Sequence, residues 1–204
     1  MSLDTYANLK VAVREWTRRN DIDAHIDDVI DICEAEIYHG VDPLRLRSME
    51  TRSTADMDGT RYLALPTGFL QMRQLRATAK NEDIRFRAPE QMAVHTTSGK
   101  PRFFTITSQL ELDRVPDDTY EVEMSYYKIP TPLSSANTSN DVLANHPNIY
   151  LYGCRWAAYD YASEPEMANY NYGKFVNAIK GANRSDKKGR YGTAPVMRIE
   201  GCTP

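Results

Sequence analysis

The stretch HPNIYLYGCRWAAYDYASEPEMANYNYGKF, residues 146–175, decides how the last part of this chain folds. It contains six of the thirteen tyrosines and one of the two tryptophans. Apolar side chains recur there along two faces: Ile149, Tyr152, Trp156 and Tyr159 on one, and Tyr150, Cys154, Ala157 and Tyr161 on the other. This period predicts a helix that is apolar on most sides, and such a helix is buried among other elements or between subunits.

The sequence SEPE, residues 163–166, interrupts the helical pattern. A proline disfavours helical backbone in the residue before it, so Pro165 is expected to end the helix at or before Glu164. We therefore expect one helix that begins at Pro147 and a second that runs from about Pro165 to Ala182, with a corner between them.

The tyrosines of this region suit packing within a subunit or between subunits, because a tyrosine buries a large ring while its hydroxyl keeps a partner. A nucleic-acid stacking platform would interleave its aromatic side chains with Lys and Arg. Between residues 146 and 173 the only Lys or Arg is Arg155. Seven residues are predicted for core or subunit packing: Tyr150, Tyr152, Trp156, Tyr159, Tyr161, Tyr170 and Tyr172. A ligand or nucleic-acid site is the alternative.

Two helices are also predicted near the N-terminus. The first has a possible cap at Asp4 or Thr5. Its apolar face includes Leu9, Val13 and Trp16, which recur with a helical period. The second has an apolar face made of Ile26, Val29, Ile30, Cys33 and Ile37.

The second of these helices is strongly acidic. Residues 21–36, DIDAHIDDVIDICEAE, hold seven acids and no Lys or Arg. Four acids lie off the apolar face: Asp27, Asp28, Asp31 and Glu34. A solvated helix face is the simplest interpretation, and a charged surface that faces a partner is the alternative. Like charges four residues apart destabilise a helix by roughly a few tenths of a kcal/mol, so the crowding needs a reason.

After Pro43 the chain changes to the two-residue alternation of strands that bury one face of an antiparallel sheet. A hairpin is expected around a turn near Ser108, with these facing pairs: Phe104 and Ile106 against Leu110 and Leu112. Two further sets alternate: Ile84, Phe86 and Ala88, and Tyr120, Val122, Met124 and Tyr126. An Asp58-Gly59 turn is expected between two more candidate strands.

These patterns predict an α+β fold, a helical bundle with an inserted antiparallel β-rich module and an extended C-terminal tail. The predicted boundaries are residues 1–48 and 142–182 for the helical core, 49–130 for the β-rich insertion and 183–204 for the tail. The last of these segments has glycines and prolines without a sustained period. Such a segment is typically extended until a partner holds it.

The composition is ordinary for a soluble globular protein, with 41 % hydrophobic and 26 % charged residues. No apolar run reaches the roughly 18 residues that a membrane span needs, and the N-terminus lacks a signal-peptide pattern, so we expect no membrane partner. The three cysteines and four histidines are scattered, which argues against disulfides and zinc. No catalytic or phosphate-binding motif is recognisable. We therefore predict no catalytic residue, no metal and no cofactor.

Charge is unevenly distributed along the chain. Residues 180–204 contain six bases and two acids, a net charge of +4, whereas the whole chain carries −3, so residues 1–179 carry −7. An acidic body with a basic tail indicates electrostatic docking to a partner or between copies. A DNA-gripping domain would instead present a basic face.

Four segments occur in an order that resembles a known family: METRST (49–54), DGTRYLALP (58–66), GKPRFFTI (99–106) and HPNIYLYG (146–153). Together they resemble the head-to-tail adaptor proteins of tailed bacteriophages, which are also called connector or neck proteins. The resemblance covers nearly the whole chain. No single segment identifies the family, and the ordered set carries the resemblance.

The resemblance implies a structural protein and not an enzyme. It implies a ring of identical subunits, twelve-fold like the portal, that lies beneath the portal, extends the DNA channel and provides the platform for tail attachment. The implied partners are the portal protein, tail or nozzle proteins, other copies of this chain, and DNA that passes without sequence-specific binding. The implied location is the virion neck, after synthesis in the host cytoplasm.

In similar adaptors a C-terminal extension lodges against the portal subunits, and residues 183–204 match it in position. The anchors that we predict are the aromatic, aliphatic and arginine side chains of this small-residue tail: Arg190, Tyr191, Val196, Met197, Arg198 and Ile199. Two other functions remain as alternatives: an adaptor-associated peptidoglycan hydrolase, and a nucleic-acid-binding protein that uses the basic tail.

Overall fold

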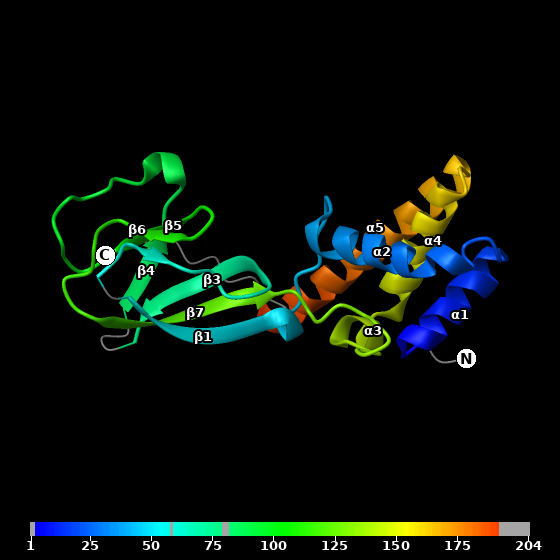
Figure 1. Cartoon of the computed structure of the whole chain (residues 1–204), viewed down its shortest axis with the longest axis horizontal. Coiled ribbons are helices and arrows are strands. Elements are labelled where there is room, and N and C mark those ends of the chain that lie inside the picture. The colour runs from blue at the N-terminus through cyan, green and yellow to red at the C-terminus, as the bar shows by residue number, and fades with distance from the viewer. Residues whose placement is uncertain (1–2, 58, 79–81, 192–204) are drawn as a thin grey trace. The chain divides into compact units, whose positions relative to one another are not determined.

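The computed structural model describes residues 3–57, 59–78 and 82–191. The chain divides into two compact units, which Figure 1 shows as one group of helices and one group of strands. The helical unit is formed by Met1–Ser48 and Pro130–Pro204, and the sheet unit by Met49–Ile129. The predicted α+β class is confirmed. Each unit is described by itself below.

Five α-helices make up the described part of the helical unit: α1 Tyr6–Thr17, α2 Ile26–His39, α3 Asp141–Asn145, α4 Pro147–Tyr161 and α5 Pro165–Tyr191. Thr5 caps α1, because its hydroxyl oxygen accepts from the backbone N–H of Asn8 at 3.3 Å. Pro147 occupies the first turn of α4, where its missing N–H costs nothing. Short 3₁₀ helices are η1 Asp23–His25, η2 Arg47–Met49 and η3 Pro89–Gln91.

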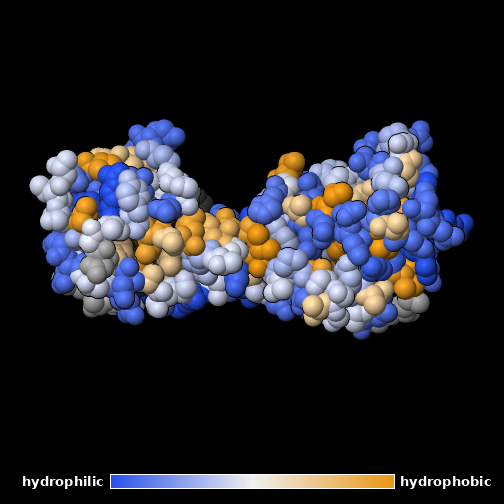
Figure 2. Space-filling view, in the orientation of Figure 1, coloured by the Kyte–Doolittle hydropathy of each residue, from blue (hydrophilic) through white to orange (hydrophobic). Residues whose placement is uncertain are grey.

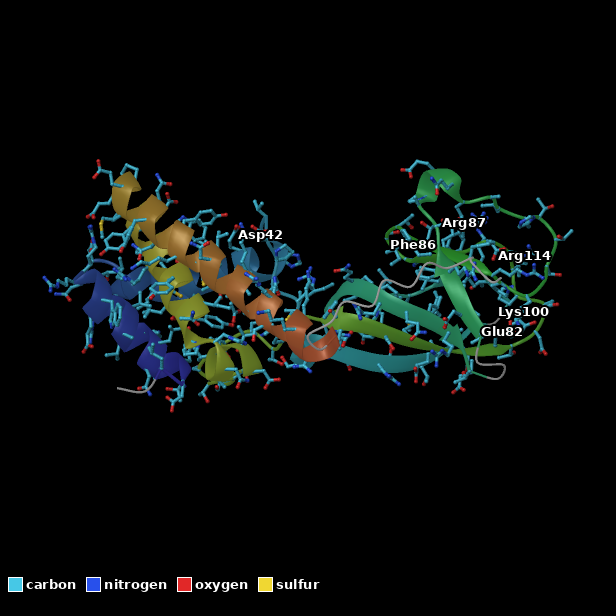
Figure 3. All side chains as sticks on the ribbon, turned by 180° about the vertical axis from the view of Figure 1, so that it is seen from behind. Asp42, Glu82, Phe86, Arg87, Lys100 and Arg114 are labelled. Atoms are coloured by element: carbon cyan, nitrogen blue, oxygen red, sulfur yellow. The ribbon has the colours of Figure 1, made fainter. Side chains whose placement is uncertain are left out.

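Helix α4 is the centre of the helical unit and contacts α1, α2, α3 and α5. Gly153 marks its closest approach to two of these helices. A β-carbon there would clash with the Cys33 sulfur on α2 and with the Phe175 ring on α5. The predicted corner also exists, because Ser163 takes a left-handed conformation (φ 57°) between α4 and α5. Figure 3 shows α5 lying along α4.

The sheet unit contains seven strands: β1 Glu50–Met57, β2 Tyr62–Leu63, β3 Phe69–Ala77, β4 Glu82–Phe86, β5 Phe103–Ile106, β6 Leu110–Leu112 and β7 Tyr120–Lys128. Their order is β1-β7-β3-β4-β5-β6-β2. The pairing of β4 with β5 is parallel and the other pairings are antiparallel. The result is a nearly closed, mostly antiparallel sheet.

The sheet core includes several of the alternating residues that the sequence indicated. Val122 and Met124 of β7 and Ile84 of β4 are buried there, together with Leu75 of β3. The hairpin prediction is confirmed, because Phe104 pairs with Leu112 and Ile106 pairs with Leu110.

Strands β1 and β2 lie on either side of Asp58-Gly59, as the sequence predicted, and they pair with β7 and β6. Two expectations about single side chains are wrong. Phe86 is 58 % exposed at the end of β4, where its ring centre lies 5.6 Å from that of Phe104. Trp16 is 53 % exposed. The next residue, Thr17, is buried instead. Its hydroxyl tolerates burial because it donates to the Val13 carbonyl oxygen at 2.8 Å.

The expected extended tail is helical in its first part, because α5 continues nine residues past Ala182 to Tyr191. Polar contacts hold this extension, which explains why the apolar period gave no sign of it. The Asn183 side chain accepts from the Arg45 backbone N–H at 2.9 Å and donates to the Pro43 carbonyl at 3.1 Å.

Farther along α5, Asp186 accepts from the backbone N–H and the Nε of Arg47, at 3.2 and 3.0 Å. Together, Asn183 and Asp186 fasten the end of α5 to the segment that follows α2. Residues 192–204 lie outside the described residues.

Candidate assembly surfaces

Tyr150 belongs to a buried polar cluster and not to a surface. Its hydroxyl donates to Glu34 Oε1 at 2.8 Å and accepts from Asn140 Nδ2 at 2.8 Å. The Tyr38 hydroxyl lies 3.5 Å away, and the Leu133 backbone N–H donates to the same Glu34 oxygen at 3.1 Å. Burial raises the pKa of Tyr150 and the pKa of Glu34, and the Tyr150 hydrogen bond partly offsets the rise at Glu34.

This cluster corrects the expectation that the acids of α2 form one solvated face. Glu34 is buried, because the loop after β7 places Leu133 over it. A buried carboxyl group is tolerated when hydrogen bonds satisfy it, and here a hydroxyl and a backbone N–H do so. The cluster therefore ties α2, α4 and the loop at Leu133 together, and its role is structural.

Trp156 and Tyr172 pack inside the helical unit, between α4 and α5. Their ring centroids lie 5.1 Å apart, and Phe175 stacks on Trp156 at 6.3 Å. The Tyr172 hydroxyl donates to Glu36 Oε1 at 2.8 Å, and this hydrogen bond raises the pKa of Tyr172. These two of the seven predicted packing residues therefore hold α4 against α5.

An aromatic strip crosses the side of α4 that lies away from α2. We define it as Trp16 from α1, Tyr152, Arg155 and Tyr159 from α4, and Tyr170 and Lys174 from α5. The Arg155 guanidinium lies 5.5 Å from the Trp16 ring centre and 6.0 Å from that of Tyr159. The Lys174 ammonium lies 5.4 Å from the ring centre of Tyr152 and 4.4 Å from that of Tyr170.

Two large rings of the strip are open to solvent, since Trp16 is 53 % and Tyr170 is 57 % exposed. The hydrogen bond and charge of Lys174 lower the pKa of Tyr170. Arg155 is the only Lys or Arg between residues 146 and 173, and Lys174 follows directly after that interval. The sequence alone therefore did not reveal that a second cation contacts these rings. Tyr161 lies apart from the strip, 5.1 Å from the His25 ring, and is also 53 % exposed.

Helix α2 presents an acidic face to solvent. We define this acidic face as Asp28, Asp31, Ile32, Ala35 and His39, all of them exposed. Ile32 is the apolar residue at its centre and is 51 % exposed. Asp31 makes no ion pair with any residue of the described ranges. Figure 2 shows single hydrophobic residues surrounded by hydrophilic ones on the visible side of the helical unit.

Asp27, at the edge of this face, is used inside the unit. It pairs with Lys10 at 2.6 Å and accepts from the Tyr6 hydroxyl at 2.7 Å. The hydrogen bond from Lys10, followed by that from Tyr6, lowers the pKa of Asp27. Of the five acids of α2, Glu34 is buried, Asp27 is paired and Glu36 accepts from Tyr172. Asp28 and Asp31 point outward, and Asp28 lies 3.5 Å from the His25 ring nitrogen.

The predicted portal anchors fall at the end of the described chain. Arg190 is half-buried on the last turn of α5, and Tyr191 is the last residue of that helix. Four predicted anchors lie outside the described residues: Val196, Met197, Arg198 and Ile199.

A group of basic side chains around β4, β5 and β6 is a feature of the sheet unit that sequence reasoning missed. Figure 3 labels Arg87, Lys100 and Arg114 there, together with Phe86 and Glu82. The Arg87 guanidinium lies 3.4 Å from the centre of the Phe103 ring. Lys100 pairs with Glu82, and Arg114 Nε lies 3.1 Å from Asp113 Oδ2. These residues are far apart in sequence and come together because β4 pairs with β5 and β5 pairs with β6, which only the topology could have revealed.

The described residues hold no group of three or more His, Cys, Asp or Glu side chains that could bind a metal ion. Over the same residues, every helix is too short or too polar to cross a bilayer.

Comparison with protein families finds a match over nearly the whole chain. The family model described as SU10 adaptor protein matches residues 4–198. The matched segment includes both units and three of the four predicted anchors that follow α5 (Val196, Met197 and Arg198). No curated protein matches this chain.

Proposed function

The chain belongs to the SU10 adaptor protein family, and on that premise we propose that this phage head-to-tail adaptor assembles into a ring beneath the portal. The observation that carries the proposal is the family match over residues 4–198. The ring, twelve-fold like the portal, extends the DNA channel and provides the platform to which tail or nozzle proteins attach. Adaptors are structural virion proteins, so the peptidoglycan-hydrolase alternative gains no support from the family.

The charge of the chain supports a role as a conduit. Residues 1–179 carry a net charge of −7, and a channel that lets DNA slide is better lined by weak or negative charge than by bases. Each tight contact between a base and a phosphate would act as a brake on the moving DNA. DNA therefore passes without sequence-specific binding.

The C-terminal residues dock on the portal in this proposal. Arg190 and Tyr191 lie at the end of α5, and the apolar and arginine side chains at 196–199 follow five to eight residues later in the sequence. A segment that becomes ordered only on its partner delays assembly until the portal ring is present, because the cost of ordering is met at docking.

The experiment compares two truncations in a pull-down with portal rings. The chain without residues 192–204 keeps all of α5 and is expected to fold with an unchanged melting temperature while losing portal binding. The chain without residues 183–204 also loses Asn183 and Asp186, so it is expected to melt at a lower temperature. Unchanged portal binding by the chain without residues 192–204 would refute the docking role. The number of copies per portal ring, measured by native mass, tests the ring itself.

A further inference from the structure

Two exposed faces of the helical unit differ in chemistry and point in different directions. We propose that, in the ring, the acidic face of α2 in one copy packs against the aromatic strip of the next copy. The occupant of the strip is thus a second copy of this chain. This inference rests on the proposed ring and specifies which residues form its repeating contact.

The position of the two faces follows from α4. Tyr150 and Cys154 point toward α2, since the Tyr150 carbonyl oxygen lies 3.9 Å from the Cys33 sulfur and the Tyr150 hydroxyl donates to Glu34. At 3.6 residues per turn, the strip residues of α4 lie roughly 150° around the helix from this pair. The acidic face lies on the outer side of α2, so α2 separates it from α4 and the two faces lie on opposite sides of the unit.

Opposite faces suit a ring. Identical subunits in a ring meet through a heterologous contact, in which two different patches of each copy touch the neighbours on either side. A two-fold dimer would require each patch to match itself. The strip carries Arg155 and Lys174 and the acidic face carries Asp28 and Asp31, so each patch repels its own kind and attracts the other.

The chemistry of contact is complementary. Ile32, 51 % exposed, can bury its side chain among the rings of Trp16 and Tyr170. Asp28 and Asp31 flank Ile32 on the same helical face, where they meet the two cations of the strip. Tyr, Trp and Arg are the residues that most often carry the energy of protein interfaces. Because a stable interface needs roughly 800 Å² per partner, this contact forms the centre of a larger one.

Single-stranded nucleic acid is the rival occupant, because bases stack on aromatic rings beside cations. Two arguments favour the protein. A DNA duplex keeps its bases stacked and leaves no free face for the rings. The acidic face supplies the opposite charge and the missing apolar side chain from the same molecule.

The test uses exposed residues in the full-length protein, so that folding is preserved. Ile32→Lys and Tyr170→Ala are expected to weaken ring assembly, measured by sedimentation with and without portal rings, about tenfold or more. The matched controls are Val41→Lys, an exposed aliphatic residue outside the acidic face, and Tyr161→Ala, which is as exposed as Tyr170 but lies off the strip. Both controls are expected to assemble like the wild type, and all four variants to melt near the wild-type temperature.

A crosslink locates the contact directly. Chains carrying Ile32→Cys and chains carrying Tyr170→Cys, both in a Cys202→Ser background, are mixed and treated with a flexible bismaleimide. Crosslinked dimers are expected from the mixture and not from either chain alone, because the contact joins unlike faces.

The outcomes separate this inference from the function on which it rests. Normal rings from Ile32→Lys and Tyr170→Ala, beside normal wild-type rings, would overturn the inference and leave the ring intact. A wild-type chain that stays monomeric even in the presence of portal rings would overturn both this inference and the proposed ring. Tyr170→Ala rings that are normal but bind a short single-stranded oligonucleotide more weakly than the wild type would assign the strip to nucleic acid.

Discussion

Gly153 is the residue at which three helices of the helical unit meet. Its hydrogen faces the Cys33 sulfur on α2 and the Phe175 ring on α5, so neither neighbour leaves room for a methyl group. Gly153 and Ala157 are small and four residues apart, a spacing that permits a close helix neighbour. The sequence could not indicate that α2 is one such neighbour, because Cys33 lies more than a hundred residues earlier in the chain.

Gly153→Ala is expected to destabilise the protein by about 1–3 kcal/mol, the usual cost of overpacking a core. Gly173→Ala is the matched control, because Gly173 also lies inside a helix but a β-carbon there meets nothing within 4 Å. That substitution is expected to stabilise by about 0.5–1 kcal/mol through helix propensity. Urea unfolding of both variants measures the contrast. A loss of similar size in the two variants would show that Gly153 is not a packing contact.

Glu34 gives the protein a pH-dependent term of known sign. Burial raises the pKa of this carboxyl group above its unfolded value, so the folded state binds the proton more readily than the unfolded state. The stabilisation is complete below the unfolded pKa and is lost as the pH rises through the folded pKa. Glu34→Gln keeps an oxygen acceptor for Tyr150 and Leu133 but does not titrate.

The stability of the wild type is therefore expected to decline as the pH rises above the ordinary glutamate pKa. The variant Glu34→Gln is expected not to show this part of the decline. The measurement is the free energy of unfolding from pH 4 to pH 8 for both proteins. Parallel curves over that range would mean that the native carboxyl group is not perturbed. The burial of Glu34 could not be predicted from the acidic pattern of α2, because a loop nearly a hundred residues later covers it.

At the scale of elements, the end of α5 depends on two polar side chains. Asn183→Ala is expected to destabilise the protein by about 1–2 kcal/mol, since it removes the hydrogen bonds that the Asn183 side chain makes with the Arg45 N–H and the Pro43 carbonyl. Lys187→Ala, on an exposed part of the same helix, is the control and is expected to change stability little. Thermal melting of the two variants is the measurement. Equal melting temperatures would show that the extension of α5 is not held by Asn183.

The elements that the sequence predicted well are those with a regular apolar period. The corner at SEPE, the cap at Thr5 and the hairpin pairs Phe104–Leu112 and Ile106–Leu110 follow from local rules and are present. The elements that it missed are held by distant or polar contacts. The partners of β1 and β2 come from remote strands, and residues 183–191 are helical through hydrogen bonds that leave no apolar period.

At the scale of the whole molecule, the proposed ring requires each chain to contact identical neighbours on two sides. The tyrosine-rich region, residues 146–175, contributes side chains both to the internal packing of the helical unit and to its surface. Tyr150, Trp156 and Tyr172 are used within the helical unit, and Tyr159 of the aromatic strip is buried as well. Tyr152 and Tyr170 are the strip tyrosines that solvent reaches. The sequence could identify these residues as a group but not divide them, because the division depends on where α1, α2 and α5 lie around α4.

A charge exchange tests the electrostatic part of the subunit contact in the whole protein. Asp31→Lys places like charge against the strip, and Lys174→Glu places like charge against the acidic face, so each variant alone is expected to weaken ring assembly. The double variant carries both changes in every copy, and each contact again pairs opposite charges. It is therefore expected to assemble better than either single variant. Assembly is expected to be more sensitive to salt where opposite charges face each other. Additive losses in the double variant would show that Asp31 and Lys174 do not face each other across the ring, since residues that do not interact lose stability independently.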